Sequence, residues 1–333
     1  MNDAAGPAGA HGERRHEVGI RHLGSGKYSD VFSARLGSRR VALKISYYRD
    51  QTLSRAGRRA LRGDLHGAAR TKRRDAVCVS WAFARLTRRL LASVSPHFVV
   101  VHASEDCDGL AGRLRHALAA RLATLSPAQR THTNASFMER YDANLTTYLT
   151  HARLGGQAGD AAVCGVLFQV LYTLAALQRL LPGFRHNDLS TNNVLVRQVP
   201  PWGGVYRFRD RWFEVRGTPV FVALADYDFV HVPGHAQLSN ERILGGRYPG
   251  MSSAENASYD SHVFLKSVAR CLAARADGAA PGAARFLAAL GLRANDRHHA
   301  LVPELVPAVL LRHAYFAPLH TAPVAAGASY AVD

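Results

Sequence analysis

Four short runs of apolar residues within the first 141 positions of the chain have a strand-like pattern. Residues 18–32 and 41–47 combine β-branched and aromatic side chains with polar neighbours, which is the pattern of half-buried strands. Residues 98–101 form a third such run, and residues 136–141 have the pattern of a last strand that leads into a connecting segment. This part of the chain therefore predicts a strand-rich lobe.

Three other segments of the same region do not have a strand pattern. Residues 75–94 place apolar side chains near helical spacing and predict a helix. Residues 110–125 are rich in Ala, Leu and Arg and predict an inserted helix. Residues 49–74 are basic and contain three glycines, so we expect a linker or a broken helix there.

Beyond position 142 the apolar spacing is mostly helical. Residues 161–180 form a long apolar helix with the spacing of a core element, and residues 144–149 open a shorter one. Residues 197–219 depart from this pattern, because aromatic and charged residues alternate there around Pro and Gly, which predicts an extended β-hairpin.

These patterns predict an α+β fold in which strands are concentrated in residues 17–141 and helices in residues 142–317. Residues 1–16 are expected to form a flexible N-terminus. Residues 318–333 are expected to form a loosely ordered C-terminal tail.

Composition narrows the class of protein. The chain has 333 residues, of which 47% are hydrophobic and 20% charged, as in globular proteins. Its four cysteines form no C-x-x-C pair, so neither a zinc site nor a disulfide framework is indicated, and a reducing compartment fits best. No apolar run reaches the length of a membrane span, and the N-terminus lacks an apolar signal core.

The formal net charge of +17 is concentrated between residues 35 and 89. One interpretation is an interaction surface for nucleic acid or an acidic protein. The other, which the sequence favours, is a set of solvated helix faces in an Arg-rich protein. Basic side chains close to a phosphate site would also attract an anionic substrate without any nucleic acid.

The candidate chemistry is concentrated in residues 185–196. His186, Asp188 and Asn193 follow the spacing H-x-D-x-x-x-x-N and precede a short apolar run. In phosphoryl transfer, a carboxylate must orient the acceptor hydroxyl, and an amide oxygen a loop-length away must hold a magnesium ion. A loop rich in Asn, Asp, Ser and Thr is also ordinary turn chemistry, so this stretch needs support from elsewhere.

Three further motifs occur in the order that such chemistry requires. Gly24 and Gly26 lie in a G-x-G stretch with Ser29 at the third position, and glycines there let the backbone approach phosphates. Lys44 ends the run V-A-L-K in a predicted buried strand, and Asp226 opens the triplet D-Y-D after an apolar run.

Together these four motifs resemble those of the protein kinase-like superfamily, in which residues 185–196 would be the catalytic loop. The resemblance implies a bilobal fold, with a small β-rich N-lobe and hinge at 17–141 and a larger helical C-lobe at 142–317. The resemblance implies ATP and Mg²⁺ as cofactors, with Asp188, Lys44 and Asn193 as catalytic residues and Asn193 and Asp226 as metal ligands. Asp188 would be the base. The nucleotide contacts that it implies are Leu23, Gly24, Ser25, Gly26, Val31, Ala42, Lys44, Glu139 and Tyr141.

Two contacts of the catalytic loop also follow from the resemblance. His186 is expected to bond the backbone near Asp226. Asp260, at the start of a helix, is expected to bond the backbone of the catalytic loop, although a plain N-cap would favour Asp there equally.

The chain departs from the superfamily pattern at several positions. No glutamate lies between Lys44 and Glu105, so the usual helix partner of the lysine is missing, and Asp75, or less suitably Asp64, is the candidate to replace it. Ser190 stands in place of a lysine. Asn187 replaces an arginine, and the A-P-E motif is missing. Asp228 replaces a glycine, and this replacement should make the turn stiffer.

Three features resemble those of divergent serine/threonine protein kinases of large DNA viruses. They are the long hairpin at 197–219, the short segment after Asp228, and the Y-D-x-H-x-F-L stretch at 259–265. This resemblance implies transfer of phosphate from ATP to Ser/Thr hydroxyls of a protein substrate. Two alternatives remain open: a nucleotide-binding pseudokinase or scaffold, and a small-molecule phosphotransferase of the aminoglycoside-kinase type.

The same resemblance frames the partners and the location. We expect ATP and a protein substrate, no membrane partner, and nucleic acid only as the less favoured interpretation. The expected location is intracellular, in the cytoplasm or nucleus of a host cell or with the virion, and neither secreted nor transmembrane. The oligomeric state stays open.

Overall fold

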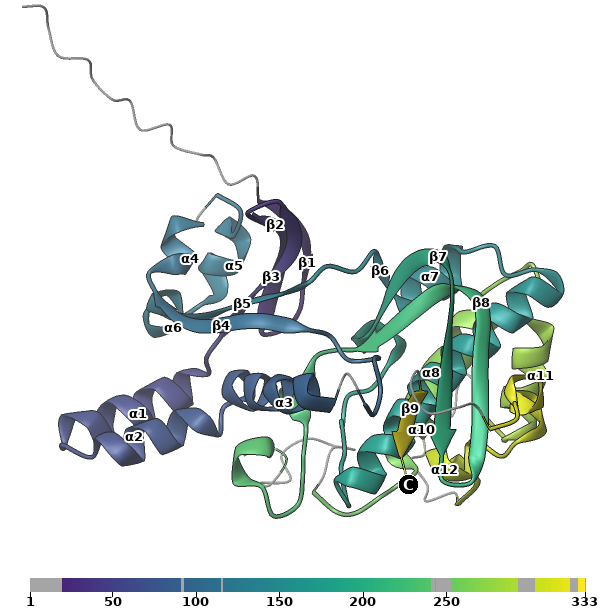
Figure 1. The fold of residues 1–333 in the computed structure, drawn as a ribbon. Helices are drawn as coiled ribbons and strands as arrows, with labels where there is room; N and C mark the ends of the chain where they lie inside the picture. Colours follow the sequence, from purple (N-terminus) through teal and green to yellow (C-terminus); the bar gives the residue numbers. More distant parts are fainter. Residues whose placement is uncertain are drawn as a thin grey trace, which may run out of the picture.

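The structure is a computed structural model, and it describes residues 20–90, 93–114, 116–240, 243, 253–292, 303–323 and 329–332. The segment 1–16 that the sequence predicted to be flexible lies outside these residues. Figure 1 shows a strand-rich N-lobe joined to a larger, helical C-lobe, which is the predicted bilobal α+β fold.

The N-lobe is built on one five-stranded antiparallel sheet. Its strand order is β1-β2-β3-β5-β4, so β3 lies at the centre and pairs with β2 on one side and β5 on the other. The strands are β1 (Arg21–Ser25), β2 (Ser29–Leu36), β3 (Arg39–Tyr47), β4 (Val101–Asp108) and β5 (His132–Glu139).

The inserted segment covers one face of this sheet. The predicted single helix at 110–125 is instead broken into α4 (Leu110–Arg113) and α5 (Ala119–Thr124), followed by α6 (Pro127–Thr131). Ala111 and Leu118 from this segment are buried against Phe32 and Ile45 of the sheet. The insertion therefore closes the small hydrophobic core of the N-lobe.

The predicted strand at 98–101 is mostly wrong. β4 begins only at Val101, whereas Phe98 forms an isolated parallel bridge with Leu224 in the C-lobe. Phe98 is fully buried, and Val99 packs with Tyr141 in a small apolar cluster. Burial against the C-lobe therefore takes these β-branched residues out of the N-lobe sheet.

The basic segment after β3 is neither a linker nor one broken helix. It forms two complete helices, α1 (Asp50–Leu61) and α2 (Leu65–Arg73), which lie side by side and project from the body (Figure 1). Gly63 has φ +78° in the turn between them, a conformation that glycine adopts without strain. The Asp64 carboxylate caps α2 by accepting from the Gly67 amide at 2.7 Å.

α3 (Ala76–Leu90) follows, and it confirms the helix predicted at 75–94. Its buried face includes Val79 and Phe83, and Phe83 contacts Tyr227 with ring centroids 4.7 Å apart. The helix therefore packs against the segment that carries the D-Y-D triplet.

The C-lobe is organised around α8 (Gly156–Leu180), which confirms the predicted core helix. Among the described helices, α8 has the length and apolar character of a membrane-spanning segment. However, 83% of its most apolar stretch is buried inside this lobe, which is the setting of a core helix. Other helices of the lobe are α7 (Leu145–His151), α10 (Tyr259–Ala273), α11 (Pro281–Ala289) and α12 (Pro307–Leu310).

The predicted hairpin is present and longer than expected, as β7 (Val194–Phe208) and β8 (Arg211–Leu224). It packs along α8, where the buried Gln169 side chain donates to Val220 O at 3.2 Å and accepts from Val222 N at 3.0 Å. The hairpin begins directly after the catalytic loop and ends directly before Asp226. It therefore holds both segments of the candidate site on one rigid support.

The expectation of a loosely ordered tail does not hold for Ser329–Val332. These residues form β9, which pairs in parallel with β7 from Val205 to Phe208. Tyr330 also packs against Tyr206 with ring centroids 5.4 Å apart. The otherwise open edge of the hairpin explains this pairing, because unpaired backbone groups at a strand edge accept another strand.

Candidate active site

A cavity of about 690 Å³ lies between the N-lobe sheet, α3 and the segments that flank the hairpin. From the N-lobe side, the cavity is lined by the glycine-rich stretch, the central strand β3 and one face of α3. From the C-lobe, it is lined by residues near positions 193 and 226. The cavity therefore lies where the sequence predicted a nucleotide. All of the predicted nucleotide and metal residues line it, namely Leu23, Gly24, Ser25, Gly26, Val31, Ala42, Lys44, Glu139, Tyr141, Asn193 and Asp226.

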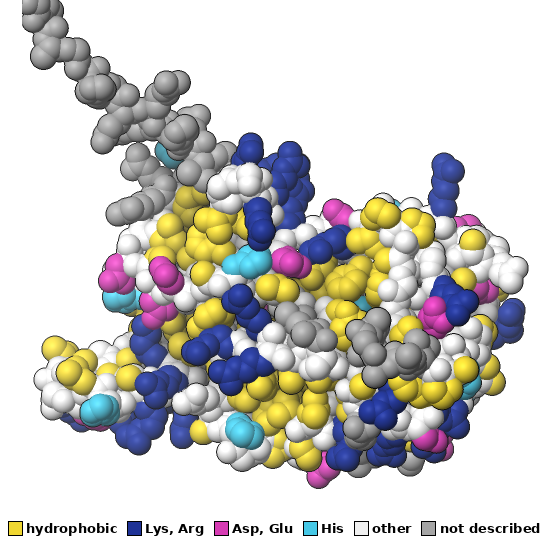
Figure 2. All heavy atoms as spheres, viewed as in Figure 1, with side chains coloured by type: hydrophobic (Ala, Val, Ile, Leu, Met, Phe, Trp, Pro, Cys, Tyr) yellow, Lys and Arg dark blue, Asp and Glu magenta, His cyan; other side chains and the backbone are white. Residues whose placement is uncertain are grey.

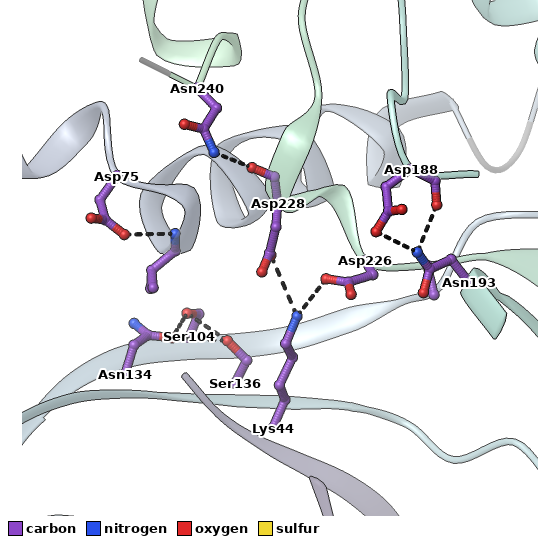
Figure 3. A network of polar contacts seen from close by, with 12 residues as sticks. Lys44, Asp75, Ser104, Asn134, Ser136, Asp188, Asn193, Asp226, Asp228 and Asn240 are labelled. Atoms are coloured by element: carbon purple, nitrogen blue, oxygen red, sulfur yellow. Dashed lines mark hydrogen bonds and ion pairs between the residues drawn. The ribbon is translucent and has the colours of Figure 1, made fainter. Parts of the chain in front are cut away.

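Asp188 is outside the lining but directly adjoins it. The Asn193 side-chain amide donates to Asp188 O at 2.7 Å and to Asp188 Oδ2 at 3.1 Å (Figure 3). The amide group is therefore oriented by the aspartate, which leaves the Asn193 Oδ1 oxygen as the group that can face a cation.

Lys44 is the centre of the polar network in Figure 3. Its ammonium group lies 2.7 Å from Asp226 Oδ1 and 3.4 Å from Asp228 Oδ1, and its side chain is only 13% exposed. The lysine therefore has two carboxylate partners, and both come from the D-Y-D triplet.

The expectation that Asp75 or Asp64 pairs with Lys44 is wrong. Asp75 is fully engaged elsewhere, because it accepts from Arg49 Nε at 2.9 Å and from the Thr52 hydroxyl at 2.6 Å. It also precedes α3 and accepts from the backbone there (Figure 3). Asp64 lies in the α1–α2 turn, where it pairs with Arg59 at 3.0 Å.

Asp228 replaces the missing helix glutamate as the second partner of Lys44, a role that the sequence did not reveal. Ser80, on the cavity-facing side of α3, lies near this carboxylate and acts to lower its pKa. Asn240 donates to the Asp228 carbonyl at 2.6 Å and fixes the backbone of the turn. Lys44 therefore takes its second carboxylate from the D-Y-D triplet, while α3 brings a serine close to that carboxylate.

Two residues of the site adopt a left-handed backbone conformation. Asn187 has φ 67° and Asp226 has φ 63°, and Asn and Asp are the side chains that tolerate this region best after glycine. The Asn187 side chain donates to Phe229 O at 3.0 Å. Strained backbone at adjoining catalytic segments is a common property of functional sites.

The predicted contacts of His186 and Asp260 are confirmed. Asp260 accepts from the backbone amides of His186 at 2.7 Å and Asn187 at 2.9 Å, while the N-cap position of α10 belongs to Ser258. The His186 ring bonds Ala225 O at 3.0 Å through Nε2. The catalytic loop, α10 and the residue before Asp226 are thereby joined into one unit.

The three aspartates differ in their electrostatics. Burial raises the pKa of Asp188, and the nearby Asp226 charge adds to this. Burial acts in the same direction on Asp226, but the adjacent Lys44 ammonium outweighs it and the pKa of that carboxyl is lowered. The pKa of Asp228 is raised to about 7, first by burial and then by the charge of Asp226. The site therefore keeps one strongly ionised carboxylate beside Lys44.

The donor set fits magnesium in the way expected for a phosphate-bound ion. Mg²⁺ prefers hard oxygen ligands and is usually held by one or two carboxylates together with substrate phosphates and waters. Asp226 and Asn193 supply a carboxylate and an amide oxygen on one wall of the cavity. In the described part of the chain, no cluster of three or more His, Cys, Asp or Glu residues could hold a metal by protein ligands alone.

The inserted segment holds the glycine-rich stretch from above. Arg121 of α5 donates to the carbonyls of Gly26 and Lys27, the second at 3.3 Å, and pairs with Asp30 at 3.0 Å. Asp30 is buried and also accepts from the Tyr47 hydroxyl at 2.8 Å. One arginine therefore fixes both ends of the turn that would cover the phosphates.

The hinge side of the cavity is closed by a stacked ion pair. Arg197 of β7 donates to Glu139 at 2.7 Å, and its guanidinium lies 4.6 Å from the centre of the Tyr141 ring. The Glu139 amide already donates to Val100 O at 2.9 Å. A bound base would therefore meet hinge groups other than this amide.

Comparison with known proteins agrees with this picture at a general level. The chain is 27% identical over 112 residues to the "Putative serine/threonine-protein kinase R400" of Acanthamoeba polyphaga mimivirus. That match covers 31% of this chain and 23% of the viral protein, so the chain spans less than a quarter of its relative. A search of protein-family models found no match.

Among solved structures, the chain is similar to a crystal structure of a kinase domain, with 12% identity and a TM-score of 0.36. The alignment covers 65% of this chain and 51% of the solved one. The fold assignment rests on the lobes, sheet order and motif positions described above rather than on this likeness. The chain is therefore kinase-like in fold and in the order of its site motifs, and its sequence resembles that of a viral serine/threonine-protein kinase.

Proposed function

We propose that the protein transfers the terminal phosphate of ATP, bound with Mg²⁺, to a Ser or Thr hydroxyl of a protein substrate. One observation carries this proposal: Lys44, Asn193 and Asp226 line one cavity, and Asp188 adjoins it through its bond with Asn193. Lys44 bonds Asp226, 182 positions away, and Asn193 bonds Asp188 beside them. Phosphoryl transfer depends mainly on positioning and electrostatic stabilisation, which this arrangement supplies.

Each residue has a role that follows from its surroundings. Lys44 offers a desolvated positive charge to the phosphates below Gly24 and Gly26. Asp226 and Asn193 would hold the magnesium ion, which offsets charge on the transferring group when bound. Asp188 orients the acceptor hydroxyl, and its raised pKa makes it a better proton acceptor than an exposed aspartate.

The choice of a protein acceptor is supported by the likeness to the mimivirus protein named as a putative serine/threonine-protein kinase, and by the contacts that fix the candidate catalytic loop to α10. A small-molecule acceptor would use the same four side chains. Measuring phosphate transfer to proteins and to aminoglycosides distinguishes a protein kinase from a small-molecule phosphotransferase.

A radiolabelled ATP assay on generic basic and acidic protein substrates tests the proposal. We expect magnesium-dependent incorporation that disappears with EDTA and falls at least about a thousandfold in Asp188→Asn, because general-base positioning and charge are lost together. Lys44→Met and Asp226→Ala should be similarly inactive. Equal incorporation by wild type and Asp188→Asn would overturn the assignment.

A nucleotide-binding pseudokinase is the second candidate. It is favoured by Ser190, which stands where the superfamily carries a lysine, and by the two carboxylates that compete for Lys44. A thermal shift with Mg-ATP but no phosphate incorporation on any substrate would support it. Autophosphorylation that Lys44→Met abolishes would exclude it.

A further inference from the structure

The α1–α2 hairpin encloses a strongly basic hollow outside the nucleotide cavity. Its volume is about 560 Å³. Its lining consists of six arginines and one threonine, namely Arg55, Arg58, Arg59, Arg62, Arg70, Thr71 and Arg74. We call this feature the arginine hollow.

The spacing of these arginines places them on facing sides of the two helices. Residues 55, 58, 59 and 62 recur at helical spacing along α1, and residues 70 and 74 are one turn apart on α2. Two stripes of guanidinium groups therefore meet across the hairpin, within a footprint of about 10 Å along α1.

Nearby acidic groups leave most of this charge uncompensated. Residues 49–75 contain nine basic and three acidic side chains. Asp50 accepts from the Ser126 hydroxyl, Asp75 is bound by Arg49, and Asp64 pairs with Arg59 and is also close enough to Arg70 for that charge to lower its pKa. Within the part of the chain that the structure describes, Arg58, Arg62 and Arg74 have no ion pair.

A second feature marks the outer end of the same hairpin. Leu61 and Leu65 flank the turn and are 90% and 68% exposed, the two highest values among the large apolar side chains described. Figure 2 shows apolar side chains at this outer end and Lys and Arg side chains between it and the body. An isolated exposed leucine is ordinary, but two at a projecting tip beside six arginines form a combined apolar and basic surface.

We propose that this hairpin docks on an anionic phospholipid membrane, with headgroup phosphates in the arginine hollow and Leu61 and Leu65 in the boundary between headgroups and acyl chains. Basic clusters on amphipathic helices are attracted to anionic leaflets, and apolar side chains at the same edge add burial that a soluble polyanion cannot provide. The described lining contains no aromatic side chain on which nucleic-acid bases could stack.

The hairpin is also placed suitably for such a contact. α1 is 12 residues long, or about 18 Å, and it projects away from both lobes, so the tip reaches a surface before the body does. The sequence predicted no membrane partner because no apolar run could span a bilayer; a surface contact needs no such run. The inference does not use the nucleotide cavity.

Co-sedimentation of the full chain with vesicles tests the proposal. Vesicles of phosphatidylcholine alone are compared with vesicles in which about a third of the lipid is phosphatidylserine, at low and at physiological salt. We expect at least about tenfold stronger binding to the anionic vesicles, weakening as salt rises.

Variants separate the two halves of the surface. Leu61→Ser with Leu65→Ser should weaken binding about tenfold or more, and Arg58→Gln with Arg62→Gln should do the same. Leu36→Ser is the matched control, because Leu36 is 54% exposed beside Arg35 and Arg39 on a different surface, and it should bind like wild type. Circular dichroism is used to check that each variant is folded. We expect every variant to fold, because the substituted side chains are exposed.

Soluble polyanions form the last arm of the experiment. Inositol hexakisphosphate and a short DNA duplex are tested without lipid. Binding of either that Leu61→Ser with Leu65→Ser leaves unchanged, together with no preference for anionic vesicles, would assign the hollow to a soluble ligand and overturn the proposal. Equal loss of vesicle binding in Leu36→Ser would overturn it as well.

Discussion

Lys44 Nζ lies 3.4 Å from Asp228 Oδ1, and Ser80 of α3 lies near the same carboxylate. A carboxylate that the superfamily places on the helix is thus supplied here by the end of the D-Y-D triplet. The chemical requirement, a negative partner for a buried ammonium, is met from a different place in the chain.

This relationship predicts a rescue. Asp228→Gly should lower kcat about 10- to 100-fold, because Lys44 loses one of its two carboxylate partners, while Asp226 still holds it. Adding Ser80→Glu should recover most of that loss, since a glutamate at this position of α3 can reach the space that Asp228 leaves. Phosphate incorporation is measured for wild type, both single variants and the double variant.

Ser80→Glu alone is the control. It places a third carboxylate beside Lys44, so it should be no more active than wild type. A double variant as inactive as Asp228→Gly would show that Asp228 acts through the turn geometry rather than through its charge.

Asp260 should contribute strongly to stability. Asp260→Ala leaves the buried amides of His186 and Asn187 without an acceptor, and each such loss costs about 1–3 kcal/mol. The free energy of unfolding from urea titration should fall by about 2 kcal/mol or more. Asp277→Ala removes an exposed partner of Arg275, and it should change the free energy of unfolding much less than Asp260→Ala does. Similar values for the two variants would contradict this role.

Arg121 should govern nucleotide affinity more than turnover. Arg121→Ala removes its contacts with the Gly26 and Lys27 carbonyls and frees the glycine-rich stretch. We expect KM for ATP to rise about 5- to 20-fold with kcat changed less than threefold, because ordering of the stretch must then occur on binding. Arg130→Ala is the control, since Arg130 bonds only Leu125 O within the insertion. A loss in kcat alone would refute the assignment.

His97 should make stability depend on pH. The ring is fully buried, with Nδ1 bonded to Val222 O at 2.8 Å and Nε2 to the Tyr206 hydroxyl at 2.8 Å. Burial lowers its pKa to about 3, against about 6.5 in the unfolded chain. The unfolded state therefore binds a proton that the folded state does not, and stability falls as pH decreases from 6.5 toward 3.

At pH 5 this histidine alone should cost about 2 kcal/mol of unfolding free energy relative to pH 7. Urea unfolding of wild type and His97→Gln at both pH values isolates the effect, because the other titrating groups are common to both proteins. The variant should lose less stability between pH 7 and pH 5. An identical loss in the two proteins would mean that His97 is protonated in the folded state.

Local pattern was sufficient for much of the molecule. The core helix α8, the hairpin of β7 and β8, and α3 all follow from the spacing of apolar residues, and α8 is buried on every side from Val163 to Leu177. The contacts of Asp260 and His186 were expected from the resemblance to the protein kinase-like superfamily, and the structure has both. Where the predictions failed, at residues 49–74, 98–101 and 329–332, partners distant in sequence decided the outcome.

The sequence by itself determined the α+β architecture and which side chains line the cavity, because apolar spacing sets the helices and strands and the four motifs occur in the order typical of the protein kinase-like superfamily. Only the tertiary structure decided the partner of Lys44, since Asp75, Asp64 and Asp228 are all short carboxylates and distance alone chooses among them. The folded chain also set the arginines of α1 and α2 face to face with two exposed leucines at their tip. Charge along a sequence does not reveal such convergence until two helices pack.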